Sequence, residues 1–319
     1  MKWLTSAIAL LAAQVVSASP ALVKRASVND VATVGYASLN GGTTGGSGGP
    51  TTTVSTLEEL TAAVAGDEPK IVIISGTITG DAIVEVGGNT SVLGNDAAYR
   101  QFPVLNGIGL RVIDVSNVII RNIKISKVLA PGDNVAVQAA SQVWLDHLDL
   151  SSDRDHDKDF YDGLLDITHG PTGVTVTNSI LHDHWKGSLV GHSDNNGAED
   201  VAITVTYANN YFSNLNSRTP SFRFGTGHIF NNVFDNNNDG INTRDGAQLL
   251  VENNVWTGTT KPLYATDEGF AVAVGNDFGG AENTAPVGTF TAAPYPYTLI
   301  PTDGVRAAVV GTAGATISF

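Results

Sequence analysis

A short motif recurs at a fixed interval in the C-terminal half of the chain. The segments 209–212 (NNYF), 231–234 (NNVF) and 253–256 (NNVW) start 22 residues apart, and each joins an asparagine pair to an apolar or aromatic pair. A repeat of this length is about half that of a propeller blade, and it lacks the leucine pattern of a leucine-rich solenoid. The repeat therefore predicts a stack of short coils built from strands.

The same pattern continues upstream in a looser form. The segments 118–123, 143–150 and 174–181 are rich in β-branched residues and show no helical periodicity. With about three short strands in each coil, they predict an all-β fold, a right-handed parallel β-helix. Asparagine suits the recurring bend because it tolerates the left-handed backbone region, and stacked asparagines can bond from coil to coil. The 32 residues between Asn178 and Asn210 predict an inserted loop of about ten residues.

The two ends of the solenoid have patterns of their own. Thr56 followed by Glu59 forms a capping box, which predicts a short helix over 56–64 that caps the N-terminal end. The glycine-rich segment 41–50 predicts an irregular surface loop. The tail 294–319 leaves the repeat pattern, and we expect it to pack along the outside of the coils.

The first residues indicate export from the cell. A lysine at position 2, an apolar stretch over 4–16 and small residues after it predict a signal peptide at 1–18. The stretch is too short to span a bilayer, and its alternative interpretation is a buried helix. A possible propeptide, 19–25, ends at the dibasic pair Lys24-Arg25. The mature domain is then 26–319, a secreted, extracellular protein with no membrane anchor.

The charge balance excludes one class of partner. The chain carries a formal net charge of −14 at pH 7, so nucleic acid, which requires a basic face, is not expected to bind. Cysteine is absent, so a secreted chain of this kind must depend on a large regular core instead of disulfides. Asn89 begins the one Asn-x-Ser/Thr sequon and is a possible glycan site in a turn.

Two aspartates lie four residues apart in the segment 162–166 (DGLLD). Strand alternation can place Asp162 and Asp166 on one face of a sheet. Two carboxylates that point at one place repel each other unless a cation lies between them, and their oxygens are the hard ligands that Ca²⁺ prefers. The alternative, a pair of turn or cap aspartates, stays open at this point.

Basic residues follow in two further clusters. The segment 182–186 (HDHWK) pairs two histidines, but no third ligand stands at zinc spacing, and Lys186 suits an anionic sugar better. Arg218 and Arg223 flank Pro220, whose bend can bring both into one cleft, where guanidinium forks match carboxylates. The alternatives are a polar strand end for the first cluster and two solvated surface arginines for the second.

Together these motifs resemble polysaccharide lyase family 1, the pectate lyases and pectin lyases, and in particular the secreted fungal pectate lyases. The resemblance covers residues 55–260. The segment 143–147 (VWLDH) is similar to the family's Trp-Ile-Asp-His signature, and the segment 162–166 is similar to its Asp-Gly-x-x-Asp segment. The segment 184–191 is similar to the His-x-Lys…Leu-x-Gly motif of the family, and the segment 218–232 is similar to its Arg-x-Pro-x-x-Arg…His…Asn-Asn motif. Four motifs in the family's order make the resemblance specific.

The resemblance implies an activity and a cofactor. A pectate lyase makes endo-type cuts in (1→4)-α-D-galacturonan by Ca²⁺-dependent β-elimination and gives 4,5-unsaturated oligogalacturonides, which degrades plant cell wall pectin. The reaction removes the C5 proton, α to the uronate carboxylate, and expels the C4 oxygen. Positive charge beside that carboxylate stabilises the enolate-like intermediate. We expect a monomer, because a solenoid with capped ends needs no partner.

The resemblance also assigns roles residue by residue. It implies three calcium ligands: Asp133, Asp162 and Asp166. It implies that Lys186 and Arg223 bind substrate carboxylate and that Arg218 is the catalytic base, a demanding role for a guanidinium. Asp146 and His147 are expected to be structural and to orient their strand beside the cleft.

The chain departs from the family in two places, and two other functions remain. Ser221 follows Pro220 where the family often has arginine, so one positive charge is missing, and the disulfides common in the family are absent. A pectin lyase would act on methyl esters without calcium and would lack the three aspartates. A non-catalytic pectin-binding β-helix would have lost Arg218 or Lys186.

Overall fold

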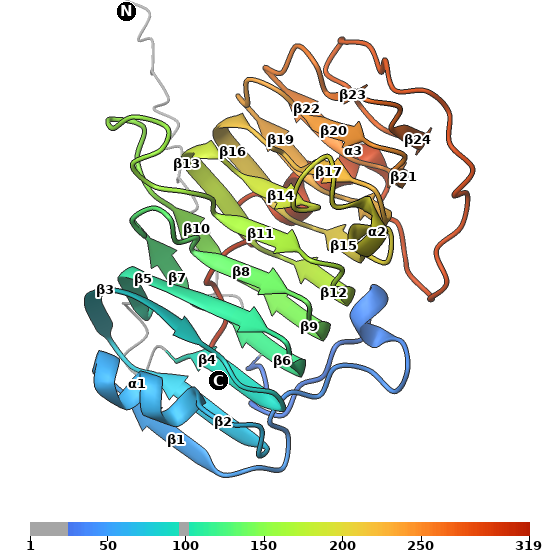
Figure 1. Cartoon of the computed structure of the whole chain (residues 1–319). Helices are drawn as coiled ribbons and strands as arrows, with labels where there is room; N and C mark the ends of the chain where they lie inside the picture. The colour runs from blue at the N-terminus through green and yellow to red at the C-terminus, as the bar shows by residue number, and fades with distance from the viewer. Residues whose placement is uncertain (1–24, 96–101) are drawn as a thin grey trace, which may run out of the picture.

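The strands of the chain stack in parallel into a solenoid. The computed structural model describes residues 25–95 and 102–319, so the predicted signal peptide 1–18 lies outside the described residues. Figure 1 shows the coils rising in chain order from the blue N-terminal end to the red C-terminal end. In the described part of the chain no helix is long and apolar enough to cross a membrane.

One sheet takes a strand from each successive coil. In the described residues it contains, in order, β1 (Thr51–Val54), β2 (Lys70–Ile74), β4 (Thr90–Gly94), β6 (Ser116–Arg121), β9 (Ser141–Asp146), β12 (Thr172–Thr177), β15 (Thr204–Ala208), β18 (Thr226–Phe230), β21 (Gln248–Glu252) and β24 (Phe270–Val274).

A second sheet consists of two runs joined by β5 (Val104–Ile113), whose first residues pair with β7 and whose last pair with β8. The first run is β22 (Val255–Thr257), β19 (Val233–Asp235), β16 (Tyr211–Ser217), β13 (Ile180–Lys186), β10 (Asp149–Ser151) and β7 (Lys124–Ser126). The second run is β8 (Val135–Gln138), β11 (Leu165–Thr168), β14 (Ser188–Val190), β17 (Ser221–Arg223), β20 (Ile241–Arg244) and β23 (Leu263–Ala265). Beside them, β3 (Thr77–Glu85) pairs with β5.

From β6 onward the chain visits the ten-stranded sheet, the first run and the second run in turn, and then returns to the first sheet one coil later. Each coil therefore supplies three strands, and every pairing within these sheets is parallel. The prediction of a right-handed parallel β-helix is confirmed.

An asparagine ladder holds the last coils together. Nδ2 of Asn210 donates to Oδ1 of Asn232 at 3.1 Å, Asn232 donates to Asn254 at 2.9 Å, and Asn254 donates to Asn276 at 3.0 Å. The residue before each of the first three has a left-handed backbone, with φ of 59°, 55° and 48° in chain order. The repeat thus encodes a bend and a bond to the next coil, as predicted.

The apolar half of the repeat builds an aromatic stack inside the solenoid. The rings of Phe212 and Phe234 lie 4.8 Å apart with an interplanar angle of 9°, and those of Phe234 and Trp256 lie 4.6 Å apart at 6°. All three side chains are buried. Equivalent positions fall directly above one another because the coils are equal in length, so like side chains pack on like.

The N-terminal cap is the predicted helix, α1 (Leu57–Val64). Oγ1 of Thr56 accepts from the Glu59 amide at 3.2 Å, as in a capping box. The second bond of a capping box runs from a backbone amide at the N-cap to the glutamate side chain. Here Oε2 of Glu59 accepts from the amide of Ser55 at 2.8 Å, one residue before Thr56. Leu60 and Val64 are buried, so α1 closes the apolar end of the solenoid.

The segments outside the coils follow the predictions as well. The segment 41–50 contains only turns and irregular backbone. The tail packs outside, where Val305 and Val309 of α3 (Thr302–Val309) join a cluster with Val233 and Val255. The predicted insertion is the loop after β14, which carries α2 (Gly197–Asp200), and a short 3₁₀ helix η1 (Tyr36–Ser38) lies near the start.

Candidate active site

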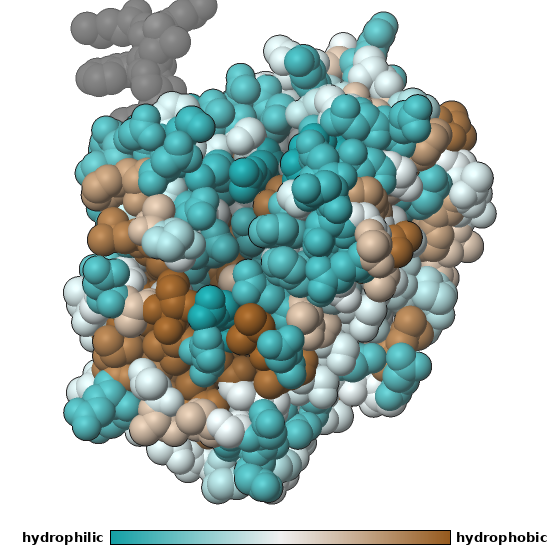
Figure 2. Space-filling view, viewed as in Figure 1, coloured by the Kyte–Doolittle hydropathy of each residue, from teal (hydrophilic) through white to brown (hydrophobic). Residues whose placement is uncertain are grey.

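The second run of strands presents the polar face of the molecule. Figure 2 shows hydrophilic side chains gathered over β11, β14 and β17, with an apolar patch over β3, β5 and β8 beside them. Asp166 on β11 pairs with Leu189 on β14, which pairs with Ser221 on β17. Partners in a parallel sheet share a face, so side chains from coils far apart in sequence meet here.

Two of the predicted aspartates converge on one glycine. A Cβ atom at Gly163 would lie 2.7 Å from Oδ1 of Asp133 and 2.7 Å from Oδ1 of Asp166. The Gly163 amide donates to Asp133 Oδ1 at 2.7 Å. A side chain at position 163 would separate the carboxylates of Asp133 and Asp166. This explains why glycine follows Asp162 in the segment 162–166.

These carboxylates are electrostatically strained. Burial, followed by the nearby charges of Asp166 and Asp162, raises the pKa of Asp133 to about 8. Burial also raises the pKa of Asp166 to about 6, although its Oδ1 accepts from the Leu189 amide at 3.1 Å. Like charges held this close favour either protonation or a bound cation.

Lys186 connects the third aspartate to the cluster. Its Nζ donates to Oδ1 of Asp162 at 2.6 Å and to Oδ1 of Asp159 at 3.3 Å. The Lys186 side chain is only 13% exposed, whereas that of Asp159 is 62% exposed. Asp159 is therefore an exposed counter-ion that an incoming anion can replace.

The donor set suits a hard divalent cation. Three carboxylates in one cluster supply the oxygen ligands that Ca²⁺ prefers. Within the described residues, no three His, Cys, Asp or Glu side chains already surround one point at metal spacing. Oδ1 of Asp162 is already paired with Nζ of Lys186 at 2.6 Å.

Arg218 lies immediately after β16, at the border of this cluster. Its Nη1 is 3.9 Å from Oδ2 of Asp166, and its side chain is 32% exposed. The backbone is left-handed, with φ of 61°, and the Arg218 carbonyl accepts from the Ser188 amide at 2.6 Å. The backbone is thus fixed by the neighbouring coil while the guanidinium remains accessible to a substrate.

Arg223 lies further along the same run, outside the aspartate cluster. Its Nε donates to Oδ1 of Asp194 at 2.6 Å and lies 3.5 Å from Oδ2 of Asp245. Asp194 comes from the inserted loop after β14, and its side chain is 62% exposed. The structure brings Asp133, Asp162, Asp166, Lys186 and Arg218 together and places Arg223 apart from them, with Asp194 as its partner.

Arg244 is a further charged residue beside Arg223 that the motifs did not reveal. It pairs in register with Arg223 on the adjacent strand, and its Nη2 donates to Asp194 at 3.0 Å and to Asp267 at 3.0 Å. Its Nε is buried without a hydrogen-bond partner among the described residues. The signal in the sequence was its position 21 residues after Arg223, close to one coil.

The two histidines of the 182–186 segment serve separate contacts. Nε2 of His184 donates to the Asp162 carbonyl at 2.7 Å, and burial lowers the pKa of this imidazole. His182 pairs with Asp149 at 3.0 Å and with Asp183 at 2.7 Å. These contacts give structural roles to both rings and leave the zinc alternative without support.

Asp146 belongs to the other sheet. It is fully buried at the end of β9, where it binds Arg121 at 2.6 Å and His147 at 2.8 Å. Arg121 also binds Asp30 at 2.7 Å, which fixes the N-terminal segment against this sheet. The pair Asp146-His147 is structural, as expected, but it anchors the N-terminal segment.

Asn89 sits in the turn before β4 with a left-handed φ of 49°. Its Nδ2 donates to the Asp67 carbonyl at 3.0 Å, and its Oδ1 accepts from Asn117 at 2.9 Å. A glycan on Nδ2 would replace the first of these bonds. Glycosylation of Asn89 stays a prediction.

Known proteins resemble this chain along most of its length. A family model described as "Pectate lyase" matches residues 1–263. Pectate lyase A of Aspergillus niger is 58% identical over 325 aligned residues, which cover 100% of this chain and 99% of the relative. Pectate lyase A of Emericella nidulans is 58% identical over 299 residues, 93% of this chain and 90% of the relative. The crystal structure of a pectate lyase from Bacillus sp. N165 in complex with trigalacturonate superposes with a TM-score of 0.75 at 31% identity, covering 89% of this chain and 98% of that one.

Proposed function

We propose, because this chain belongs to the pectate lyase family, that its acidic cleft binds Ca²⁺ and cleaves polygalacturonate by β-elimination, with Arg218 as the base. The chain is a pectate lyase, a polysaccharide lyase, by its identity to the fungal enzymes over its full length. We propose the role of each site residue and the endo mode of cleavage. The substrate is the galacturonan of plant cell wall pectin.

One observation carries this assignment. Three carboxylates, Asp133, Asp162 and Asp166, share one face with Lys186 and Arg218, and the closest opposite charges lie 2.6 Å and 3.9 Å apart. A face with this mixture of charges repels a polyanion unless a cation is added. With a cation it presents positive charge beside a base, which is what β-elimination of a uronate requires.

The donor chemistry supports Asp133, Asp162 and Asp166 as the calcium ligands. When bound, Ca²⁺ would neutralise a uronate carboxylate and so acidify the neighbouring C5 proton. Lys186 then exchanges Asp159, its exposed counter-ion, for a substrate carboxylate. Its low exposure reduces solvent screening and strengthens that contact.

Arg218 accepts the C5 proton in this proposal. Its guanidinium is exposed enough to reach substrate, and no hydrogen bond from its side chain occurs among the described residues. The bond from Ser188 fixes the Arg218 backbone. The neutral guanidine takes the C5 proton, the electron pair of the C5–H bond forms the C4–C5 double bond, and the C4 oxygen leaves with its bonding pair and takes a proton from water.

Arg223 and Arg244 bind further carboxylates of the polymer. They lie side by side on β17 and β20, and both use the exposed Asp194 as counter-ion. We infer that Arg244 supplies the positive charge that the family places after Pro220, where this chain has Ser221. The cleft then contacts several uronates at once, which favours cutting within long chains.

The test is the release of unsaturated product, measured by absorbance, from polygalacturonate and from highly methylated pectin. We expect activity on polygalacturonate that EDTA abolishes and added Ca²⁺ restores. Full activity in EDTA with a preference for methylated pectin would identify a pectin lyase instead. Binding of pectin without any product would identify a non-catalytic binding protein.

We also propose that the enzyme is a secreted, extracellular monomer. Signal peptide 1–18 and propeptide 19–25 would leave a mature chain from Ala26. A mature chain that begins at Ala26 keeps the contact between the Ala26 nitrogen and the Ser318 carbonyl, which are 2.9 Å apart. Sequencing the N-terminus of the protein from culture medium tests the boundary, and light scattering tests the monomer.

A further inference from the structure

Asp245 is a nearly buried carboxylate that the proposed mechanism does not use. It follows Arg244 directly, in the turn after β20, and its side chain is 13% exposed. Its Oδ2 is buried and accepts no hydrogen bond from the residues that the structure describes. A buried carboxylate oxygen without a donor is unfavourable, so it favours any arrangement that brings a donor to it.

Arg223 holds a donor that Asp245 lacks. Its Nε lies 3.5 Å from Oδ2 of Asp245 but only 2.6 Å from Oδ1 of Asp194. Nε carries a single proton, so it can make one good hydrogen bond at a time. The bond from Arg223 lowers the pKa of Asp194, whereas burial and the charge of Asp194 raise the pKa of Asp245. The two carboxylates therefore compete for one donor, and Asp194 has it.

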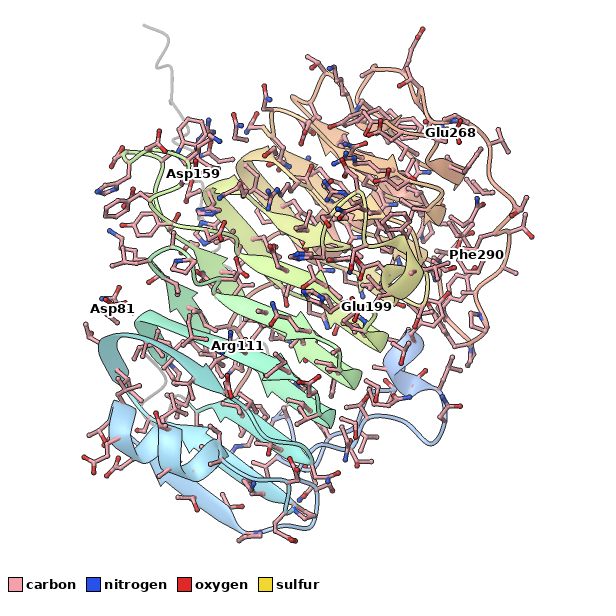
Figure 3. The ribbon with its side chains drawn as sticks, viewed as in Figure 1. Asp81, Arg111, Asp159, Glu199, Glu268 and Phe290 are labelled. Atoms are coloured by element: carbon pink, nitrogen blue, oxygen red, sulfur yellow. The ribbon has the colours of Figure 1, made fainter. Side chains whose placement is uncertain are left out.

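The two carboxylates differ in their freedom to move. The backbone of Asp245 is fixed by the neighbouring coil, because its amide donates to the Asp267 carbonyl at 2.7 Å. Asp194 lies on the inserted loop after β14, on which Figure 3 labels Glu199, and its side chain is 62% exposed. Asp194 can therefore exchange Arg223 for water, whereas Asp245 stays beside it.

The stem of Arg223 is held while its end is free to turn. A Cβ atom at Gly191 would lie 2.6 Å from Cβ of Arg223, so the stem passes directly over this glycine. A good N–H···O bond is about 2.9 Å long, so Nε has to move by roughly 0.6 Å to bond Asp245. A small rotation of the guanidinium is enough to change partners.

This change of partner would leave the outer edge of the guanidinium for a ligand. Nη1 and Nη2 form a planar fork that matches a carboxylate with two parallel hydrogen bonds. In the described residues, the hydrogen bonds of these two nitrogens are limited to the one from Nη1 to the Gly191 carbonyl, which is long at 3.4 Å. With Nε bonded to a fixed carboxylate, the fork has one orientation.

We propose that Asp245 is a positioning residue for Arg223. When a uronate carboxylate displaces Asp194, Nε of Arg223 transfers its hydrogen bond to Asp245, and Nη1 and Nη2 bind the uronate. The proposal rests on the function proposed above, which assigns Arg223 to substrate binding. It gives two aspartates at one arginine opposite effects: Asp194 competes with the substrate, and Asp245 assists it.

The test measures kcat and KM on polygalacturonate for Asp245→Asn and Asp194→Asn. Asparagine fits the left-handed backbone at position 245, where φ is 48°, and removes the charge. We expect KM to rise roughly threefold in Asp245→Asn and to fall roughly threefold in Asp194→Asn, with kcat nearly unchanged in both, because Arg223 binds ground and transition states alike. Charge alone predicts a fall in KM for both variants, since each removes a negative charge beside a polyanion.

Two controls separate positioning from a general effect. Asp114→Asn makes the same change at an exposed aspartate with a similar backbone, φ of 56°, in the turn before β6, and should alter neither constant. Asp245→Asn is also made in Arg223→Ala, where its effect on KM should vanish because the residue to be positioned is gone.

A KM at or below the wild-type value in Asp245→Asn, or an equal rise in the Arg223→Ala background, would overturn the proposal. If Asp245→Asn does not fold, as judged by calorimetry, the exposed Asp194→Asn decides, and a KM at or above the wild-type value overturns the proposal. Absence of calcium-dependent activity on polygalacturonate in the wild type would instead overturn the proposed function.

Discussion

Arg223 and Arg244 are register partners on the adjacent parallel strands β17 and β20, and one carboxylate, Asp194, accepts a hydrogen bond from each of them. Two guanidinium groups side by side repel each other unless an anion lies between them. The exposed Asp194 provides that anion in the described structure, and a substrate carboxylate can take its place. We therefore propose this pair as a contact for a carboxylate of the polyanionic substrate.

Arg244→Ala should raise KM on polygalacturonate roughly tenfold and change kcat less than about twofold. A hydrogen bond to a charged group contributes about 1.5–3 kcal/mol, and this contact is made equally in the ground and transition states. Steady-state kinetics measure both constants. Lys261→Ala, which removes an exposed lysine that lies over the ring of Tyr264, is the control and should alter neither. A fall in kcat at constant KM would assign Arg244 to the chemical step.

Arg218→Lys should lose nearly all turnover while KM changes little. Lysine keeps the positive charge but lacks the planar fork and its reach. A base acts in the transition state, so its loss appears in kcat, whereas a residue that only binds carboxylate affects KM first. A guanidinium base also implies an alkaline pH optimum. If the variant retains more than about a tenth of wild-type kcat, a difference of only about 1.4 kcal/mol, the proton acceptor must be sought elsewhere, first at Lys186.

Asp133→Asn should raise the Ca²⁺ concentration needed for half-maximal activity and raise the melting temperature in EDTA. Asparagine keeps the acceptor for the Gly163 amide but cannot ionise, whereas burial and the charges of Asp166 and Asp162, which raise the pKa of Asp133 to about 8, make this carboxyl group destabilising in the folded state at neutral pH. Relief of about 1 kcal/mol of this destabilisation corresponds to a rise of roughly 2 °C in a domain of this size. Calorimetry in EDTA and calcium titration of activity check the two effects. A lower melting temperature with unchanged calcium dependence would show that Asp133 is structural.

His228 should make the protein less stable as the pH falls from 6.5 to 4. Burial lowers the pKa of His228 to about 4. Its neighbours are Glu252 at 2.9 Å, the hydroxyl of Tyr295 at 2.7 Å, and the ring of Tyr297. The unfolded state titrates near 6.5 and binds more protons in this window, so up to about 3 kcal/mol of stability is present above pH 6.5 and lost below it.

Urea unfolding at pH 7 and pH 5 measures this loss in the wild type. His228→Gln keeps a donor for Glu252 but does not titrate, so its stability should depend less on pH than that of the wild type. Equal slopes in the two proteins would rule out His228 as the source of the acid sensitivity.

Asn232→Ala should destabilise the protein by about 3 kcal/mol or more. The Asn232 side chain is fully buried and bonds the coils above and below, with Asn210 and Asn254 among its partners. Removal leaves several buried groups unpaired, each at a cost of about 1–3 kcal/mol. Asn276→Ala, at the half-buried end of the ladder, is the matched comparison and should cost less. Equal losses in urea unfolding would contradict a cooperative ladder.

The repeat allowed the coils to be predicted because they are equal in length. When each coil has 22 residues, Phe212, Phe234 and Trp256 stack, and a spacing in the sequence is also a contact in space. The capping helix was predictable for a similar reason, since its signal lies within four residues. The capping box does not specify which amide Glu59 accepts from, because Ser55 and Thr56 both offer one, and the structure shows the bond from Ser55 at 2.8 Å.

The sequence predicted which charged residues gather at the candidate site, but not how they pair. The motifs named Asp133, Asp162, Asp166, Lys186 and Arg218, and the structure assembles all five. They did not reveal that Lys186 holds Asp162, nor that the inserted loop supplies Asp194 to Arg223. Loops of unequal length separate these residues, so no fixed spacing records their contacts.

The sequence by itself determined the solenoid, because a regular repeat of strands can bury its apolar residues only against copies of itself. It also supplied the charged residues that we propose for the chemistry, since calcium, carboxylate binding and proton transfer require particular side chains. Only the tertiary structure decided which of them face one another. The register between coils brought Arg244 beside Arg223. Register depends on loops and packing across the whole stack, which no local pattern contains.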